Sequence, residues 1–163
     1  MRITPTHIYF FSDKDYLSNF FPSEFTLDDL TYSCVEQYIM AQKAILFNDI
    51  KSFEAIMVTN KPSNMKKIGR KVANFDEKIW LEQRNQILQD GIMAKFEQNE
   101  NLANLLSATN NRILVEASPY DKIYGVGLSE TNDLILDETY WKGQNLLGQT
   151  LGIVRSKLFK KLK

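Results

Sequence analysis

The stretch YSCVEQYIMAQKAILF, residues 32–47, decides the fold because its apolar residues recur at helical spacing. Ser33, followed by Glu36 three positions later, matches a capping box and predicts that a helix starts here. Positions separated by 4, 3 and 4 residues lie along one face of this helix: Glu36, Met40, Lys43 and Phe47. A carboxylate and an amine therefore share a stripe with two large apolar groups.

Two interpretations of these charges are open. Seven residues rise about 10 Å along a helix axis, which suits two side chains that reach toward one small ligand between them. In the alternative, Glu36 only closes the capping box and Lys43 extends its ammonium group into water. The helix by itself does not decide between a site and a structural role.

The composition bounds the class of protein. The 163 residues are 44% hydrophobic, which is enough apolar material for one core without metal or disulfide staples. Twenty basic residues balance twenty acidic ones, so nucleic acid is not favoured as a bulk partner. Cys34 and His7 are the single cysteine and histidine, so we expect neither a disulfide nor a metal site, and no cofactor. A reducing cytoplasm and no membrane partner fit this sequence.

Working outward from residues 32–47, strands are predicted at 6–11, at 112–118 and at 123–128, with a hairpin at 23–33 around Asp28-Asp29. Helices are predicted from Pro62, over 74–99 with Asn74 or Asp76 as cap, over 101–109 and over 143–162. Residues 134–141 read as a third strand or an irregular lid. The fold class expected is α+β, one domain over residues 1–163, mostly helical, with a small sheet built from both ends of the chain.

A second group of candidate residues lies in VEASPYDKIYGVGL, residues 115–128. Glu116 and Asp121 place two carboxylates near one sheet edge, although a turn of the Asx type accounts for Asp121 and a solvent-facing strand position for Glu116. Gly125 and Gly127 flank Val126 and allow another backbone or a ligand to approach closely, or mark a bulge.

A third group lies at the last predicted helix, where Gly143 and Gly148 bracket a start near Asn145. Free backbone N–H groups at such a start suit a phosphate. Trp80 and Arg84, one helical turn apart, could supply a stacking face and a fork for phosphate or carboxylate, although a tryptophan on such a helix also suits the core. Nothing in the sequence resembles a Ser-His-Asp or Cys-His arrangement, so an acyl-enzyme is not expected.

Taken in order, several motifs resemble the NADAR, or YbiA-like, family across roughly residues 8 to 158: LSNFFPSEF, YSCVEQYIMAQKA, IGRKV, KFEQN, LVEASPYDKIYGVGL and GQNLLGQTLGIVR. The family contains N-glycosidases that cleave the ribosylamino bond of early riboflavin-pathway intermediates, and relatives that remove ADP-ribose from guanine. The resemblance implies that the chain is a hydrolase of N-glycosyl bonds.

Carried over by position, the resemblance implies that Glu36, Lys43 and Asp121 are catalytic. The resemblance places Asn19, Trp80, Glu116, Gly125 and Asn145 around them as substrate-binding residues, and Arg84, from its spacing to Trp80, and Tyr124 complete the candidate substrate-binding set. The family usually has tryptophan where this chain has Tyr124, which keeps a stacking ring but adds a hydroxyl, so substrate preference is what this difference affects. The helix interpretation predicts that Glu36, Lys43 and the turn carrying Asp121 line one cleft, with Trp80 or Tyr124 at its wall.

The chemistry that the family implies accounts for the charges on the first helix. Breaking a ribosylamine C–N bond builds positive charge on C1 and the ring oxygen, so a carboxylate from Glu36 or Asp121 would stabilise it and activate water. Lys43 would supply a proton or an electrostatic contact to ribose or phosphate. In a second route Lys43 would attack the opened sugar as a Schiff base.

The expected partner is therefore a small phosphorylated ribosyl substrate, foremost 5-amino-6-ribosylaminouracil 5'-phosphate and its precursor, with release of ribose 5-phosphate. One alternative is a hydrolase that removes ADP-ribose from guanine, and nucleic acid would be a partner only if ADP-ribosylated. Another alternative is a module that binds ADP-ribose or NAD without cleaving it.

Overall fold

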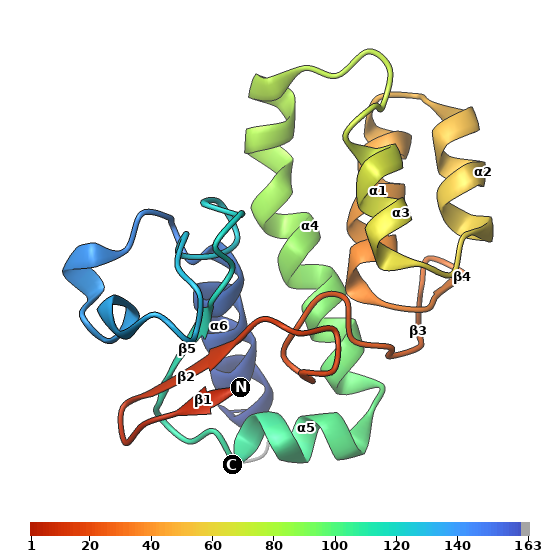
Figure 1. Ribbon diagram of the computed structural model, residues 1–163. Helices are drawn as coiled ribbons and strands as arrows, with labels where there is room; N and C mark the ends of the chain where they lie inside the picture. The colour runs from red at the N-terminus through yellow and green to blue at the C-terminus, as the bar shows by residue number, and fades with distance from the viewer. Residues whose placement is uncertain (161–163) are drawn as a thin grey trace. The chain divides into compact units, whose positions relative to one another are not determined.

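The structure is a computed structural model that describes residues 1–160 and divides into two compact units (Figure 1). Unit 1 consists of Met1–Phe21 and the chain from Glu100 onward, and unit 2 consists of Pro22–Asn99. The predicted fold class is confirmed, because helices dominate and the sheets are small. The part of the last predicted helix beyond residue 160 lies outside the described residues.

Unit 1 contains a three-stranded sheet made from distant parts of the chain (Figure 1). Strand β2 (His7–Phe10) lies in the middle, antiparallel to β1 (Arg2–Ile3) and parallel to β5 (Ile113–Glu116). Helix α5 (Glu100–Ser107) precedes β5, and α6 (Leu146–Lys160) packs against it. The sheet from both ends of the chain is thus confirmed, although β1 was not predicted.

One side of this sheet packs on the irregular chain that follows β5. The buried core there comprises Tyr9, Val115, Ala117, Val126, Leu128 and Ile135, with Trp141 packed against it. Trp141 is held in place because its indole Nε1–H donates to the Ile135 carbonyl at 2.8 Å. Leu114 alternates with Val115 along β5, so the two side chains point to opposite faces of the sheet, and both are buried.

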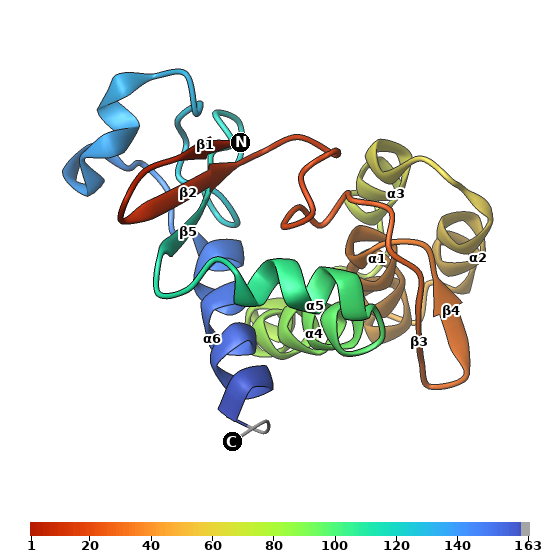
Figure 2. The same ribbon diagram turned by 90° about the horizontal axis from the view of Figure 1, so that it is seen from below.

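Unit 2 is a hairpin followed by four helices (Figure 2). Strands β3 (Phe25–Leu27) and β4 (Leu30–Tyr32) are joined by Asp28 and Asp29, whose φ values of 50° and 61° are those of a type I′ turn. The helices are α1 (Val35–Leu46), α2 (Ile50–Val58), α3 (Pro62–Gly69) and α4 (Glu77–Glu97). Helix α1 contacts each of the other three, so residues on most of its circumference are buried.

Helix α1 starts where it was predicted, but its N-cap residue makes no side-chain capping hydrogen bond. Its N-cap is Cys34, and the side chain that reaches back to the Ser33 N–H is that of Gln37, at 2.7 Å, not that of Glu36. The Ser33 hydroxyl also donates to the same Gln37 oxygen, at 3.0 Å. The capping-box explanation of Glu36 is therefore wrong. The residue whose side chain reaches back to Ser33 is the next one, Gln37, which is the third helical residue.

Two segments of unit 1 differ from their predicted structure. Residues 123–128 form no strand: Val126 donates one hydrogen bond to the Glu116 carbonyl, and Gly127 has a φ of 72°, which ends extended pairing. Residues 134–141 lie mainly in two short 3-10 helices, η1 (Asp133–Leu136) and η2 (Glu138–Tyr140). Helix α2 was not predicted, because it begins only a few residues after α1 ends. The C-cap of α1 is Phe47, and the chain then turns through Asn48, which has a φ of 55°.

Two glycines of α6 differ in the space available for a side chain. A Cβ at Gly148 would overlap the Leu114 carbonyl oxygen and come 2.5 Å from Asn145 Oδ1, whereas a Cβ at Gly152 would meet nothing within 4 Å. Gly148 therefore lets α6 approach β5, and Gly152 costs helix stability without a packing reason.

We expect Gly148→Ala to lower the free energy of unfolding by about 2 kcal/mol because the helix must shift away from β5. Gly152→Ala on the same helix should raise it by about 0.5 to 1 kcal/mol. Urea unfolding followed by circular dichroism measures both. Equal effects of the two substitutions would contradict the close approach at Gly148.

Within the described residues 1–160, every helix is too short or too polar to cross a membrane.

Candidate active site

Helix α1 carries the two predicted catalytic charges on one face. Glu36 lies in its first turn and is only 5% exposed, and Lys43 lies two turns later and is half-buried. Met40 and Phe47, on the same stripe, are buried. The predicted arrangement of two charges among two apolar groups is confirmed within unit 2.

The ammonium group of Lys43 is held against aromatic rings. Its Nζ lies 4.3 Å from the ring centroid of Phe75 and 5.4 Å from that of Trp80. Burial lowers the pKa of Lys43 from its usual value, the positive charge of Arg70 lowers it further, and the Glu36 carboxylate acts in the opposite direction. Lys43 therefore releases its proton more readily than a solvated lysine and senses the charge of Glu36.

Phe75 and Trp80 reach Lys43 through the start of α4. Asp76 is the N-cap, its carboxylate accepting from the Ile79 N–H at 3.0 Å, so Phe75 precedes the cap and Trp80 occupies the fourth helical position. These are the two positions of a hydrophobic staple, which fixes the direction in which the chain enters a helix. Phe75 was missed from sequence, and the staple spacing around Asp76 is the signal that could have found it.

The chain before Phe75 is fixed to the end of α1. The Ala73 N–H donates to the Asp49 carboxylate at 2.8 Å, and Asn74 adopts a left-handed φ of 56°. The Asn74 side chain donates to the Phe47 carbonyl at 3.5 Å. These contacts turn the chain so that Phe75 faces the ammonium group of Lys43, although the two residues are far apart in sequence.

Arg84 lies one turn after Trp80 on α4 and is only 7% exposed. Its guanidinium group makes no hydrogen bond or ion pair within residues 1–160, and its Nε atom is fully enclosed. A buried cation with no protein partner is costly, and an anionic ligand would offset that cost. Arg70, whose charge acts on Lys43, adds a second cation that sequence reasoning missed.

The remaining predicted residues lie in unit 1, where Asn145 has a structural role. Its Oδ1 accepts from the Glu116 N–H at 3.0 Å, and its Nδ2 donates to the Leu114 carbonyl at 2.9 Å, so it joins β5 to the start of α6. The N–H groups of Leu146 and Leu147 donate to the carbonyls of residues 123 and 124. The prediction that the N–H groups at this helix start are free to bind a phosphate is therefore wrong for these two groups, because each donates to a carbonyl of the preceding loop.

Asp121 organises the loop that follows β5. Its Oδ1 accepts from the N–H groups of Ile123 and Tyr124, both at 2.9 Å, which is the Asx-type turn given above as the alternative. Gly125 lies in the same loop, and a Cβ there would come 2.9 Å from the carbonyl oxygens of Glu116 and Asp121. Close backbone packing, with no need for a ligand, therefore accounts for glycine at this position.

Asn19 is 7% exposed, and its amide makes no side-chain hydrogen bond within the described chain. Tyr124 is partly exposed and lies where the loop meets α6. Both remain candidates for substrate binding. The structure groups Glu36, Lys43, Trp80 and Arg84 in unit 2 and the other predicted residues in unit 1, and a single cleft shared by Glu36, Lys43 and Asp121 stays a prediction.

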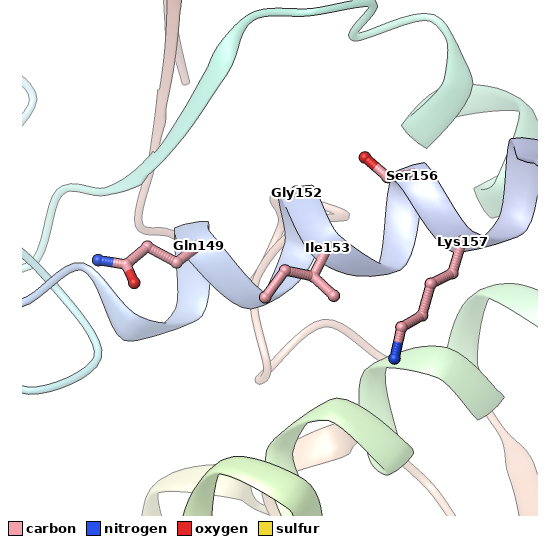
Figure 3. Close-up of a pocket in the computed structure, with 5 residues that line it drawn as sticks. All are labelled: Gln149, Gly152, Ile153, Ser156 and Lys157. Atoms are coloured by element: carbon pink, nitrogen blue, oxygen red, sulfur yellow. The ribbon is translucent and has the colours of Figure 1, made fainter.

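Two other features bear on the choice of site. Among residues 1–160 no group of three or more His, Cys, Asp or Glu side chains is arranged to hold a metal ion. A hollow of about 560 Å³ is lined by α6 alone, where Ile153 and Lys157 extend to the same side of the helix (Figure 3). This hollow has neither a carboxylate nor an aromatic ring in its lining, so it lacks the groups needed at a ribosyl C–N bond.

A buried carboxylate and a half-buried lysine lie on one helix, with aromatic rings and a buried guanidinium group in the same unit, an arrangement that makes this part of unit 2 the candidate site. The chain belongs to the NADAR family: the NADAR domain matches residues 9–159.

Relatives of known name agree with this assignment. The N-glycosidase R617 of Acanthamoeba polyphaga mimivirus is 43% identical over 76% of this chain and 73% of its own. The N-glycosidase YbiA of Escherichia coli is 32% identical over 97% of this chain and 91% of its own. The NMR structure of E. coli YbiA matches with a TM-score of 0.79 at 31% identity, over 99% of this chain and 90% of that one.

A relative from Vibrio vulnificus named "Riboflavin biosynthesis protein VVA0006" is 27% identical over 93% of this chain and 38% of its own. The predicted enzyme class, a hydrolase of N-glycosyl bonds, is confirmed by the names of the relatives.

Proposed function

We propose that the protein hydrolyses the ribosylamine C–N bond of 5-amino-6-ribosylaminouracil 5'-phosphate and its precursor, releasing ribose 5-phosphate. The observation that carries the proposal is the pairing on α1 of buried Glu36 with Lys43, whose ammonium lies over Phe75 and Trp80. The name of the Vibrio relative supports a riboflavin-related substrate. The flat rings beside the ammonium suit a planar pyrimidine.

In the proposed reaction, water adds to C1 of the ribose as the C1–N bond breaks. Glu36 accepts a proton from the water, and its negative charge stabilises the positive charge on C1 and the ring oxygen. Lys43 donates a proton to the departing amine nitrogen, which leaves with the electron pair of the C1–N bond. One water is consumed, and return of the proton from Glu36 to Lys43 restores both groups.

The pKa of Lys43 suits this role. A cation that is buried and lies near Arg70 is a stronger acid than a solvated lysine, so it transfers its proton to a weakly basic amine more readily near neutral pH. Glu36 limits this effect, because its negative charge raises the pKa of Lys43 and keeps the ammonium form populated before substrate reacts. The two charges therefore act as a coupled pair.

Arg84 is the group proposed to bind the 5'-phosphate. Its guanidinium lacks a protein partner in the described chain, and phosphate oxygens accept two parallel hydrogen bonds from arginine. This role makes Arg84 a residue kept for binding at the expense of stability.

We expect Arg84→Met to raise KM for the phosphorylated substrate at least about tenfold, because a charge-assisted contact is lost. KM for the dephosphorylated riboside should not change. The melting temperature should stay the same or rise, because an unpaired buried charge is replaced by an apolar side chain. Steady-state kinetics with each substrate measures the two KM values. An equal rise of both would contradict phosphate binding by Arg84.

The function itself is tested by incubating purified protein with 5-amino-6-ribosylaminouracil 5'-phosphate and detecting ribose 5-phosphate by mass spectrometry. Absence of turnover at high enzyme concentration would overturn the proposal. Release of ADP-ribose from ADP-ribosylated guanine in DNA, without cleavage of the riboside, would assign the protein to that activity instead. Tight binding of ADP-ribose in calorimetry with no hydrolysis of either substrate would identify a binding module.

The mechanism is tested by adding borohydride during turnover. Direct attack by water leaves the mass of the protein unchanged. A mass increase by one reduced ribose phosphate, located on Lys43 by peptide mapping, would show the Schiff-base route and overturn the proposed role of Lys43 as acid.

A further inference from the structure

The Phe75 ring lies against the ammonium group of Lys43, although this phenylalanine is not part of the core. It is 46% exposed, and the Lys43 Nζ lies 4.3 Å from its ring centroid, compared with 5.4 Å from that of Trp80. A cation within about 6 Å of a ring centroid is attracted by the negative face of the ring. Phe75 is therefore the nearer of two rings that stabilise the charge of Lys43.

The ring of Phe75 is held in this position from the end of α1. It meets the buried ring of Phe47 edge-on, with the centroids 5.3 Å apart and an interplanar angle of 64°. Asn74 donates to the Phe47 carbonyl, and the backbone N–H of the preceding residue donates to the Asp49 carboxylate. Phe47 is the C-cap of α1, four residues after Lys43, so one helix end fixes both the ring and the ammonium group.

A structural role accounts for an apolar side chain at position 75 but not for an aromatic one. Phe75 and Trp80 occupy the two positions of the hydrophobic staple of α4, where an aliphatic side chain would serve equally. An aliphatic side chain has no ring face to attract an ammonium group. The contact with Lys43 is thus the feature that requires an aromatic residue.

The surroundings of Lys43 act on its protonation in two directions. Burial lowers the pKa of Lys43 most, and Arg70, at the end of α3, lowers it further. Glu36 on α1 raises this pKa, and within the described part of unit 2 no charge on α2 or α4 adds to these two. A ring face attracts only the charged form of an amine, so Phe75 acts in the same direction as Glu36 and against burial.

We propose that Phe75 is a positioning residue, whose ring holds the Lys43 side chain as an ammonium ion at the place from which it donates its proton. This role rests on the proposed function, in which Lys43 is the acid. Phe75 acts through Lys43 and contacts no reacting atom. Its ring keeps a half-buried lysine protonated before the reaction, while burial keeps that lysine a stronger acid than a solvated one.

Two substitutions separate the ring from its apolar packing. Phe75→Leu keeps an apolar residue in the staple and removes the ring, whereas Phe75→Trp restores a ring face, that of the aromatic side chain that attracts cations best. Leu81→Ala removes an exposed apolar side chain elsewhere on α4 and is the matched control. Melting followed by circular dichroism should give nearly the same temperature for all three variants, because both positions are about half exposed.

The protonation of Lys43 is measured without turnover. Acetic anhydride modifies only the neutral amine, so brief acetylation at a series of pH values, followed by peptide mass spectrometry, gives a titration of Lys43 and of the exposed Lys51 in the same protein. We expect Phe75→Leu to lower the midpoint for Lys43 by about 0.5 to 1 pH unit and to leave that for Lys51 unchanged. Phe75→Trp should restore the midpoint, and Leu81→Ala should not move it.

The pH profile of turnover is the second measurement. In Phe75→Leu the fall of kcat at high pH should move to lower pH by the same interval, because the acid loses its proton earlier. On the plateau below this fall, kcat should change by less than about threefold. Phe75→Trp should return the profile to that of the unmodified protein.

The two measurements test Phe75 and the proposed function separately. An unchanged midpoint for Lys43 in Phe75→Leu would overturn the proposal, and so would a higher midpoint, which would show that the ring only excludes water. A lower midpoint in a protein that does not cleave the riboside would support the action of Phe75 on Lys43 and overturn the proposed function alone. Turnover with an unmoved midpoint would reject the role of Phe75 and leave the proposed function standing.

Discussion

Glu36→Gln is expected to lower turnover about 10³-fold while leaving the melting temperature near that of the unmodified protein. The amide cannot accept the proton from water and carries no negative charge to stabilise the ribosyl cation. Folding should not suffer, because the Ser33 N–H donates to Gln37 and not to Glu36, and the amide has the same shape as the carboxylate. Stopped assays for ribose 5-phosphate, with circular dichroism melting of the same preparations, measure both quantities.

Lys43→Met provides the companion measurement on the same helix. The methionine retains the packing of the lysine stem and removes the amine, so we expect at least about a hundredfold loss of turnover. In the unmodified enzyme kcat should fall at high pH with an apparent pKa below the value of about 10.4 for a solvated lysine, because Lys43 must be protonated to act as the acid. The variant should lack this limb of the pH profile.

A control in the same unit separates these effects from a general change of charge. Glu54→Gln removes an exposed carboxylate of α2 and should leave both turnover and melting temperature unchanged. If Lys43→Met keeps activity within about threefold of the unmodified protein, the assignment of catalytic charges to α1 is wrong.

Lys95→Met is expected to remove a pH dependence from the stability of the protein between about pH 7 and pH 10.5. Lys95 is 1% exposed, and its burial lowers its pKa to about 7. The unfolded chain, with a pKa of 10.5 at this lysine, binds more protons than the folded protein between these two values. The stability of the unmodified protein therefore rises with pH across this window, and the cost of burying Lys95 is complete below about pH 7.

The unfolding free energy of the unmodified protein, relative to that of the variant, should rise by roughly 3 kcal/mol between pH 7 and about 9.5. Guanidinium unfolding at several pH values gives this difference directly. Lys78→Met, at an exposed position of the same helix, should show a difference that does not change with pH. A pH-independent difference for Lys95→Met would show that Lys95 keeps its proton in the folded protein.

Local pattern determined several parts of this protein. The period of residues 35–47 placed α1 and put Glu36 and Lys43 on one face, because a helix repeats every 3.6 residues whatever surrounds it. The pair Asp28-Asp29 marked the hairpin, since aspartate tolerates the left-handed conformation that both residues adopt. Asp76 marked the start of α4, because its carboxylate accepts from an N–H three residues later.

Only the tertiary structure decided how those parts meet. It brought Phe75 and Trp80 onto Lys43, left Arg84 enclosed without a partner, and used the amide of Asn145 to join β5 and α6. It also made residues 123–128 irregular, although their composition favours a strand, because their carbonyls accept from the start of α6. Periodicity and capping depend on residues within a few positions, whereas burial, pKa and hydrogen-bond partners depend on residues that are distant in sequence and become neighbours only when the chain folds.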